Sequence, residues 1–435
     1  MVQHDEPVAV DAVAVVFDDE RVVSEAGIAL VATLASRLGI EALVNRFLHL
    51  RRDRPGAGHA GRKVMALLYA MLLGADCIDD CELLRAGRTR RLLGGWLPAP
   101  STLGTFLRAF TFGHVRQLDR VLDQTLTRAW RAGAGPGAER LVVDLDSFIG
   151  EVHGYGKEGA AFGYTKQRGY HPLLASRADS GEVLHVRLRK GSAGSPRGVV
   201  RFAEELIARV KRAGARGETL LRADSAFWNK KLLARLEKAG WSYSISVRLQ
   251  AWVPEAIARI PEADWQTLED YPKEGEAQIA ETMVDGQRLI VRRTRLVGPQ
   301  AELWPTGATS PSLPTATSRW RWSRPSTAAT PSFKLAIRDL KDQALAHFPS
   351  GVFSANSAWT VIACLAHNLL RWSALIGLPG ERVRAARTLR RRLLALPGRL
   401  TRSGGRWTLH LPARWPWQHD FNRALARIRA LPAFA

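Results

Sequence analysis

The hydrophobic period of the chain changes near residue 136, and this change limits the possible folds more than any other feature. From about residue 23 to 132, segments such as "GIALVATLASRLGIEALVNRFL" and "STLGTFLRAFTFGHVRQLDRVLDQTLTRAW" place apolar residues three and four positions apart, which is typical of helices. After "GAGPGAER" at 133–140 the period becomes two, as in "LVVDLDSFI" and "TLLRADSAF". We therefore expect an all-helical N-terminal part followed by strands.

The strands of the second part alternate with further helices. "VVRFAEELIARVKRAG" precedes the strand "TLLRADSAF" and "LLARLEKAG" follows it, a pattern that predicts an α/β core with a mixed β-sheet. Residues 240–298 alternate again as strands do, and residues 335–375 return to helical spacing. At 435 residues the chain is longer than one ordinary domain, so we expect more than one packed unit.

The chain is strongly basic. Its 63 Lys and Arg against 41 Asp and Glu give a formal net charge of +22, and the self-repulsion of such an excess favours a polyanionic partner. Arginine clusters such as "RTRRLLGG" and "RAARTLRRRLLALPGRL" favour nucleic acid as this partner. The alternative is that the arginine content only reflects a GC-rich coding sequence.

The sequence favours an intracellular location. It contains no run of 18 apolar residues, and its first residues, "MVQHDEPVAV", lack the pattern of a secretory signal. We expect a cytoplasmic, nucleoid-associated protein without a membrane partner. Cys77, Cys81 and Cys364 are too few for a disulfide framework, and we expect Cys77 and Cys81 to pack on a helix face, with a structural zinc as the alternative.

Three aspartates interrupt the apolar strands. Asp144 and Asp146 are two positions apart in "LVVDLDSF", so their side chains share one face of a strand and cannot both ionise there without a cation. Asp224 in "LLRADSAF" ends another apolar strand. Carboxylates on neighbouring strands suit two Mg²⁺ ions, which can activate a water and stabilise the leaving oxygen of a phosphodiester. The alternative is that these acids are strand-end caps or partners of buried arginines such as Arg168 or Arg222.

Five segments resemble the DDE-type transposases of bacterial insertion sequences. They are "LVVDLDSF", "EVHGYGKEGAAFGYTKQRGYHPLLA", "GEVLHVRLRKGSA", "LLRADSAFW" and "LAIRDLKDQALAHFPSGVFSANSAWTVIACLAHNLLRW". The resemblance runs in order over roughly residues 20–415. It implies a ribonuclease H-like catalytic core, a helical DNA-binding N-terminal region, and cleavage and strand transfer at the ends of a mobile element by a two-metal mechanism with Mg²⁺, or Mn²⁺ in its place.

The resemblance also implies site residues and partners. Asp146 resembles the first catalytic acid and Asp224 the second, while Asp144 is a reserve metal ligand on the same face. Tyr164, Lys166 and Arg168 in "GYTKQRGYHP", together with Arg338 and Lys341, are the expected DNA-binding residues, with ordinary hairpin packing as the alternative for the loop. The expected partners are double-stranded DNA, as terminal inverted repeats and target, and a second copy of the chain on paired ends.

The third acid of the family pattern is missing. Where the family has a Glu that opens a helix seven positions before a Lys, this chain has Lys334, and Lys341 takes the place of the later Lys. Upstream, residues 305–333 are rich in Pro, Ser and Thr and show no helix or strand period. A local slip of the reading frame, restored before Leu335, explains this composition, and a true flexible linker is the alternative.

The substitution leaves three functions open. The chain is a DDE transposase impaired at its third acid, or a catalytically inactive DNA-binding remnant or repressor at the ends of the mobile element, or a metal-dependent nuclease that acts on RNA or branched DNA. The expected division of the chain is a helical DNA-binding region (1–132), the first part of the catalytic core (140–239), a β-rich continuation or insertion (240–300), an atypical Pro/Ser/Thr-rich segment (301–334), the C-terminal helices of the core (335–378) and a basic C-terminal tail (379–435).

Overall fold

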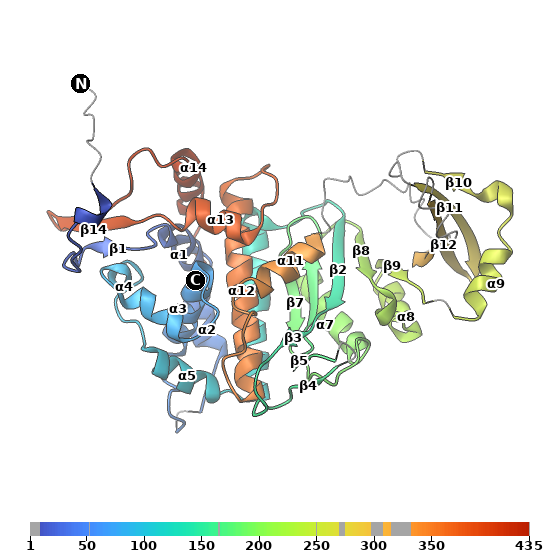
Figure 1. Ribbon diagram of the computed structural model, residues 1–435, viewed down its shortest axis with the longest axis horizontal. Coiled ribbons are helices and arrows are strands. Elements are labelled where there is room, and N and C mark those ends of the chain that lie inside the picture. The colour runs from blue at the N-terminus through green and yellow to red at the C-terminus, as the bar shows by residue number, and fades with distance from the viewer. Residues whose placement is uncertain are drawn as a thin grey trace.

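A computed structural model describes residues 9–51, 53–163, 166–248, 250–268, 275–296, 308–314 and 332–434. The molecule is elongated, with helices at one end and a large twisted sheet that extends to the other (Figure 1). This is a mixed α/β architecture, as the change of period predicts. The three sheets have the strand orders β1-β14-β15, β3-β5-β4 and β10-β11-β12-β13-β9-β8-β2-β6-β7.

Helices fill the N-terminal part, as expected. They are α1 (Ile28–Arg37), α2 (Ile40–Phe47), α3 (Ala60–Leu73), α4 (Thr89–Leu92), α5 (Pro100–Arg108) and α6 (Phe112–Ala129). Thr111 caps α6 through a reciprocal pair of hydrogen bonds with His114, which fixes where this long helix begins. The buried side chains of these helices belong to the same hydrophobic cluster as those of the large sheet. The division of this region into a separate domain therefore stays a prediction.

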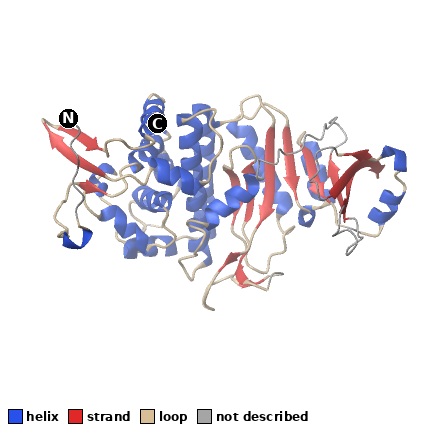
Figure 2. Ribbon diagram, turned by 45° about the horizontal axis from the view of Figure 1, so that its top comes forward, coloured by secondary structure: helices blue, strands red, loops and turns tan. Residues whose placement is uncertain are grey.

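The large sheet has nine strands (Figure 2). They are β2 (Leu141–Ser147), β6 (Leu173–Arg177), β7 (Val183–Arg187), β8 (Thr219–Ala223), β9 (Ser242–Ser246), β10 (Gln266–Thr267), β11 (Gly275–Val284), β12 (Gln287–Leu296) and β13 (Ala308–Pro314). β2, β8 and β9 are parallel neighbours, and the other neighbours in the sheet are antiparallel. The mixed sheet predicted from the sequence is confirmed.

Helices cover the sheet where its strands are apolar. α7 (Val199–Ala213) and α8 (Lys230–Lys238) pack against each other and against β7 and β9. Leu221 and Tyr243 are buried on this side of the sheet, at alternate positions to the polar Arg222 and Ser244. Because successive side chains of a strand point to opposite faces, the polar positions lie on the other face.

The C-terminal half of the chain returns to the N-terminal helices. α11 (Ser332–Lys341) packs against β6, and α12 (Phe353–Gly377) crosses the middle of the molecule in contact with α3, α6, α14 and β7. By length and composition α12 resembles a membrane span, but 89% of its apolar window is buried inside the protein, as in the core helix of a folded domain. The hydrophobic run of α12 is therefore used for packing.

The segment expected as a basic tail is folded. α13 (Ala386–Leu393), β14 (Gly398–Ser403), β15 (Arg406–His410) and α14 (Gln418–Arg429) follow α12, and β14 pairs with β1 (Val22–Val23) near the N-terminus. α14 packs against α1 and α12. Sequence spacing did not indicate the contacts of β14 with β1 and of α14 with α1, because they join residues more than 370 positions apart.

Two further expectations are changed by the structure. The absence of a helix or strand period in residues 305–333 does not exclude regular structure there, since 308–314 form β13 and α11 begins at Ser332, whereas 297–307 and 315–331 lie outside the described residues. β13 is held by backbone pairing with β12 and β9, which needs no alternating side-chain pattern. The β-rich segment 240–300 also contains α9 (Trp252–Ala258).

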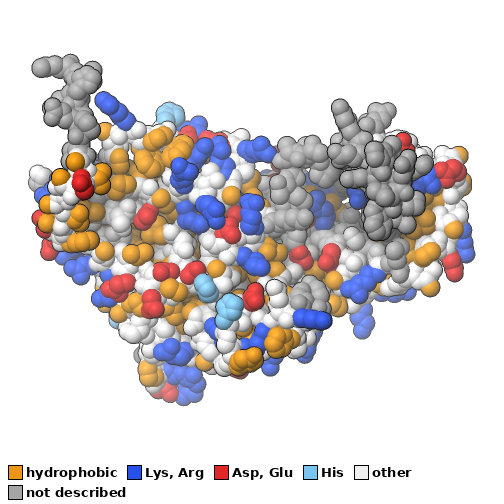
Figure 3. Space-filling view, in the orientation of Figure 1, with side chains coloured by type: hydrophobic (Ala, Val, Ile, Leu, Met, Phe, Trp, Pro, Cys, Tyr) orange, Lys and Arg blue, Asp and Glu red, His pale blue; other side chains and the backbone are white. Residues whose placement is uncertain are grey.

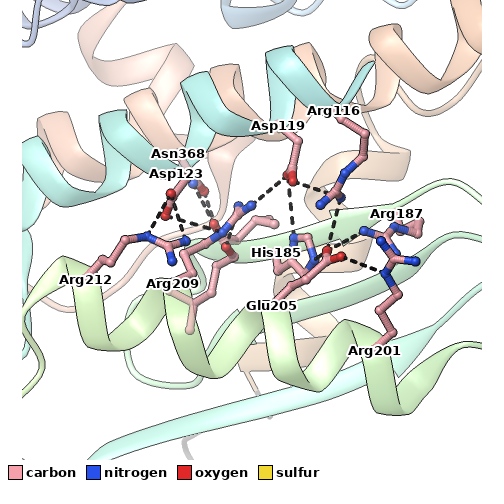
Figure 4. Close-up of polar contacts among 12 residues, drawn as sticks. Arg116, Asp119, Asp123, His185, Arg187, Arg201, Glu205, Arg209, Arg212 and Asn368 are labelled. Carbon is pink, nitrogen blue, oxygen red and sulfur yellow. Dashed lines mark hydrogen bonds and ion pairs between the residues drawn. The ribbon is translucent and has the colours of Figure 1, made fainter. Parts of the chain in front are cut away.

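A buried network of charges joins α6, β7 and α7 (Figure 4). His185 of β7 is fully buried, with Nε2 3.1 Å from a Glu205 carboxylate oxygen and Nδ1 3.6 Å from an Asp119 carboxylate oxygen. Arg209 donates to Asp119 at 2.8 Å, and Arg116 lies 3.1 Å from Glu205. These acids come from the helical part and the sheet part, so the network fixes one part against the other.

Candidate active site

Asp146 and Asp224 lie side by side at the ends of two neighbouring strands. The parallel register of β2 and β8 pairs Asp144 with Arg222 and Leu145 with Ala223, and one further step brings Asp146 beside Asp224. Neighbouring strands are about 4.8 Å apart, so the two carboxylates project from the same face within reach of one cation. The juxtaposition that the sequence predicted for the two strand ends is thus present in the structure.

The surroundings of Asp146 oppose its negative charge. Burial raises the pKa of Asp146 to about 6, the neighbouring Asp224 and Asp144 carboxylates add to the rise, and a hydrogen bond from the Ser147 N–H at 2.6 Å partly offsets it. Among the described residues, no ion pair links Asp146 or Asp224 to a basic side chain. A partly buried carboxylate beside a second one, without a counter-ion, is an arrangement that a divalent cation would stabilise.

Asp224 is exposed and is oriented by the turn that follows β8. Its side chain accepts a hydrogen bond from the Ala226 N–H at 2.9 Å and caps the short helix η4 (Ser225–Phe227). One carboxylate oxygen is fixed in this way. Asp224 is thus a cap, which was one alternative from the sequence, and its second oxygen leaves it a candidate ligand.

Asp144, the reserve ligand, is engaged by an arginine. Arg222 Nε and Nη2 donate to its two carboxylate oxygens at 2.6 and 2.9 Å, and the Asp144 side chain is buried. The alternative that an acid pairs with Arg222 is therefore confirmed for Asp144. Arg168 pairs with no acid among the described residues. Its guanidinium donates instead to the backbone carbonyls of Gly154 and Tyr155. Arg222 neutralises the Asp144 carboxylate and uses one lone pair of each oxygen, so Asp144 is a weaker metal ligand than an unpaired carboxylate.

The helix on which the resemblance places the third acid is α11. α11 packs against β6, the strand next to β2, and Lys334 falls in its first turn, where the side chains lie outside the described part of the chain. Asp339 of the same helix is buried, pairs with Arg371 and accepts a hydrogen bond from the Ala386 N–H at 3.0 Å. Asp339 thus holds α11 to α12 and α13 and is not available as a substitute.

The expected DNA-binding residues are placed in two regions. Arg338 and Lys341 are exposed on α11. Lys166 is exposed in the turn before β5 (Arg168–Tyr170), and the Arg168 guanidinium stacks 5.2 Å from the centre of the Tyr155 ring. Tyr164 lies outside the described residues. The loop contacts of Arg168 match the hairpin-packing alternative, because its donors are used within the loop.

Groups of three His, Cys, Asp or Glu ligand atoms within 4.8 Å of one another occur twice in the described part of the chain. They are Asp76–Cys77–Asp80 and Asp119–His185–Glu205, and neither includes Asp146 or Asp224. The second group is already saturated by arginines. The sequence reasoning missed it, although Asp119 and Glu205 each sit on the inner face of an amphipathic helix, which is the signal that buried acids leave.

Comparison with known proteins identifies the family of the chain. The family model described as transposase DDE domain group 1 matches residues 5–307 and 332–433, which is nearly the whole chain. The chain belongs to this family of DDE-domain transposases. The match is interrupted between 307 and 332, within the segment of atypical composition.

No curated protein matches the sequence. Among solved structures, the chain is similar to a piggyBac transposase determined by cryo-EM in a synaptic complex with hairpin DNA. The two are 13% identical, the similarity covers 85% of this chain and 79% of that one, and the TM-score is 0.46. At this level the likeness adds nothing to the family assignment.

Proposed function

We propose that this transposase cleaves and joins DNA at the ends of an insertion sequence, with divalent metal ions held by Asp146 and Asp224, and that Lys334 impairs this activity. The observation that carries the proposal is the pair of unneutralised carboxylates on neighbouring parallel strands. The strand order β7-β6-β2-β8-β9, three antiparallel strands followed by two parallel ones, supports a ribonuclease H-like core around this pair.

The residues of the chain set the conditions for chemistry. Asp146 must lose its proton before it can hold a cation, and its pKa of about 6 means that it is ionised at and above neutral pH. The hydrogen bond from the Ala226 N–H orients the Asp224 carboxylate, so Asp224 is positioned to share a cation with Asp146 before DNA binds. When bound, Mg²⁺, or Mn²⁺ in its place, supplies Lewis-acid activation of the attacking water and stabilisation of the leaving oxygen.

A basic surface lies next to this site. Arg338 and Lys341 of α11 are exposed, and so are Arg387 and Arg391 of α13. Figure 3 shows Lys and Arg side chains gathered over these two helices. We infer that double-stranded DNA, as inverted repeat or target, lies across this surface, and each phosphate contact there makes the affinity depend on salt.

A second candidate function is a DNA-binding remnant that occupies the ends of the mobile element without cutting. Lys334 favours it, because a cation in place of a carboxylate weakens the site for a second metal ion. The unmatched stretch next to Lys334 supports a local frame slip as the origin of the change. DNA binding would outlast such a change, since basic residues are also spread over the N-terminal helices and the C-terminal region.

The experiment that tests the proposal compares three proteins on a labelled DNA duplex that carries the terminal repeat. We expect Lys334→Glu to cleave the duplex with Mg²⁺ at least about 100-fold faster than the natural chain, since a restored catalytic ligand recovers several orders of magnitude in rate. Asp146→Ala in the Lys334→Glu background is the blank. Cleavage by the natural chain at the rate of the variant would show that Lys334 is not at the third position. Binding without cleavage by either protein would favour the remnant.

A further inference from the structure

The N-terminal arm, residues 9–17, exposes an unusual amount of apolar surface. Every residue from Ala9 to Val22 is exposed. Val10 is 87% exposed, Val15 is 78% exposed and Phe17 is fully exposed. Scattered surface hydrophobics are normal, but five large ones within eight residues form a contiguous patch of the kind that marks an interaction site.

A large hollow at the same end of the molecule is lined by apolar and polar side chains in similar measure. It has a volume of about 980 Å³ and lies between α1, α2 and the hairpin β14–β15. Ala32, Ile40, Met65, Leu400 and Leu409 are among the residues that line it. Figure 3 shows hydrophobic side chains gathered at this end of the molecule, beside the N-terminal segment. The chain therefore carries a partly apolar groove and an apolar arm that do not fill each other.

The arm and the groove are complementary in backbone and in charge. β15 is an edge strand, whose unpaired N–H and C=O groups accept a further strand, and the backbone on either side of η1 (Val10–Ala12) is extended. Arg37 and Arg429 line the groove, whereas Asp11 and Asp18 flank the apolar residues of the arm. In the described part of the chain none of these four side chains has an ion-pair partner.

The root of the arm directs it away from the groove of its own chain. Asp19 lies 3.4 Å from Arg399 and the Arg21 carbonyl accepts a hydrogen bond from Leu400 N, which fixes the root at β14 on the β1 side of the sheet. β15 pairs with β14 on the side opposite to β1, and residues of β15 line the groove. From its root the arm extends outward from the molecule (Figure 1).

We propose that residues 12–17 of a second copy of this chain occupy the groove and add a strand to β15. The exchange is reciprocal, so the two copies form a closed twofold dimer in which both arms and both grooves are covered. This dimer interface forms without DNA and without metal, and it does not rest on the proposed catalytic function.

The first test measures mass against concentration by sedimentation equilibrium, in the absence of DNA. We expect the natural chain to dimerise and Val15→Asp/Phe17→Asp to weaken dimerisation by about 100-fold or more, because both the apolar contacts of these side chains and their burial without a charge are lost. Leu83→Asp, whose side chain is also largely exposed (66%) but lies on another surface, is the control and should dimerise as the natural chain does. A monomeric natural chain, or a dimer unaffected by the double substitution, would overturn the proposal.

The second test distinguishes a second copy from the chain's own arm. Val16→Cys and Ser36→Cys are placed on separate chains in a Cys77→Ser background, since Ser36 is exposed and lines the groove. A short bismaleimide should join the two chains of a mixed dimer and give a product of twice the chain mass. If both substitutions on one chain instead give only an internally cross-linked monomer, the arm binds its own groove and the proposal fails.

Discussion

Two groups of acidic side chains in this molecule differ in their counter-ions. Asp119, Asp123 and Glu205 lie between α6 and α7, where arginines contact each of them (Figure 4). Asp146 and Asp224 lie at the carboxyl ends of the inner strands β2 and β8, where no basic side chain of the described residues pairs with them. The first arrangement uses acids to hold the parts of the fold together. The second leaves negative charge in place for a ligand.

The pKa values follow this difference. Burial alone would raise the pKa of Glu205, but His185, Arg187 and Arg116 lower it to about 2. Asp119 behaves in the same way, because Arg209 and His185 overcome its burial and hold its pKa far below the usual range. Burial raises the pKa of Asp146 to about 6 because no cation opposes it. Charge partners, rather than burial, thus separate the structural acids from the candidate catalytic ones.

The largest expected effect comes from breaking the paired group. Arg209→Met removes the most buried arginine partner of Asp119 and should lower the free energy of unfolding by about 3–5 kcal/mol, because the buried carboxylate keeps only the partly exposed Arg116 as an arginine partner. Urea unfolding followed by circular dichroism measures this loss. Arg201→Met is the matched control, since Arg201 is 77% exposed at 3.4 Å from Glu205 and should cost less than about 1 kcal/mol. Equal losses for the two variants would contradict the comparison.

The next effect has the opposite sign and concerns the unpaired group. The folded-state pKa of Asp146 is raised, so its contribution to stability is present below the unfolded pKa near 3.8 and is lost as the pH rises through about 6. Asp146→Asn cannot ionise and should therefore be more stable than the natural chain by about 1–3 kcal/mol at pH 8 in EDTA. Thermal unfolding from pH 3 to pH 8 checks this, and the difference should vanish below pH 4.

Magnesium provides the control for this second prediction. Added Mg²⁺ should raise the unfolding temperature of the natural chain at pH 8 and leave that of Asp146→Asn nearly unchanged, because binding to the native state stabilises it. A less stable Asp146→Asn at pH 8 would show that the Asp146 charge is already compensated, and the distinction between the two acid groups would fail.

The two acid groups were not equally predictable from the sequence. Asp146 and Asp224 could be singled out because each is an acid within or at the end of an apolar run with a period of two, and such an interruption is visible in the sequence. The partners of Asp119 and Glu205 leave no such signal, since Arg209 and His185 reach them only through the packing of α6 on α7 and β7. Likewise the order of the strands, which sets Arg222 opposite Asp144, is decided by tertiary contacts and not by period.

The same limit applies to the ends of the molecule. Helical spacing predicted α12 and the N-terminal helices, but the pairing of β14 with β1 depends on residues at opposite ends of the chain. Composition marked 301–334 as atypical, but it does not report the backbone pairing that holds β13. Local patterns thus predicted most elements and the two acids, and long-range contacts determined how they meet.

The smallest expected effect concerns Asp144, which shares its strand with the unpaired Asp146 but is paired with an arginine like Asp119. It lies on the same strand face as Asp146. Arg222 nevertheless neutralises it, as Arg209 of α7 neutralises Asp119. Arg222→Met should release the Asp144 carboxylate toward the cation site and tighten Mn²⁺ binding by about tenfold, or about 1.4 kcal/mol, through one more oxygen ligand. Titration of free Mn²⁺ by electron paramagnetic resonance measures the affinity.

A matched double substitution decides what the Arg222→Met result means. Asp144→Asn/Arg222→Met keeps the loss of the arginine but removes the released charge, so its Mn²⁺ affinity should return to that of the natural chain. General damage to the sheet edge would weaken binding in both variants alike. If Arg222→Met alone binds Mn²⁺ more weakly than the natural chain, Arg222 instead helps to orient Asp146 and Asp224. Asp144 would then be a structural acid, even though it lies beside the cation site.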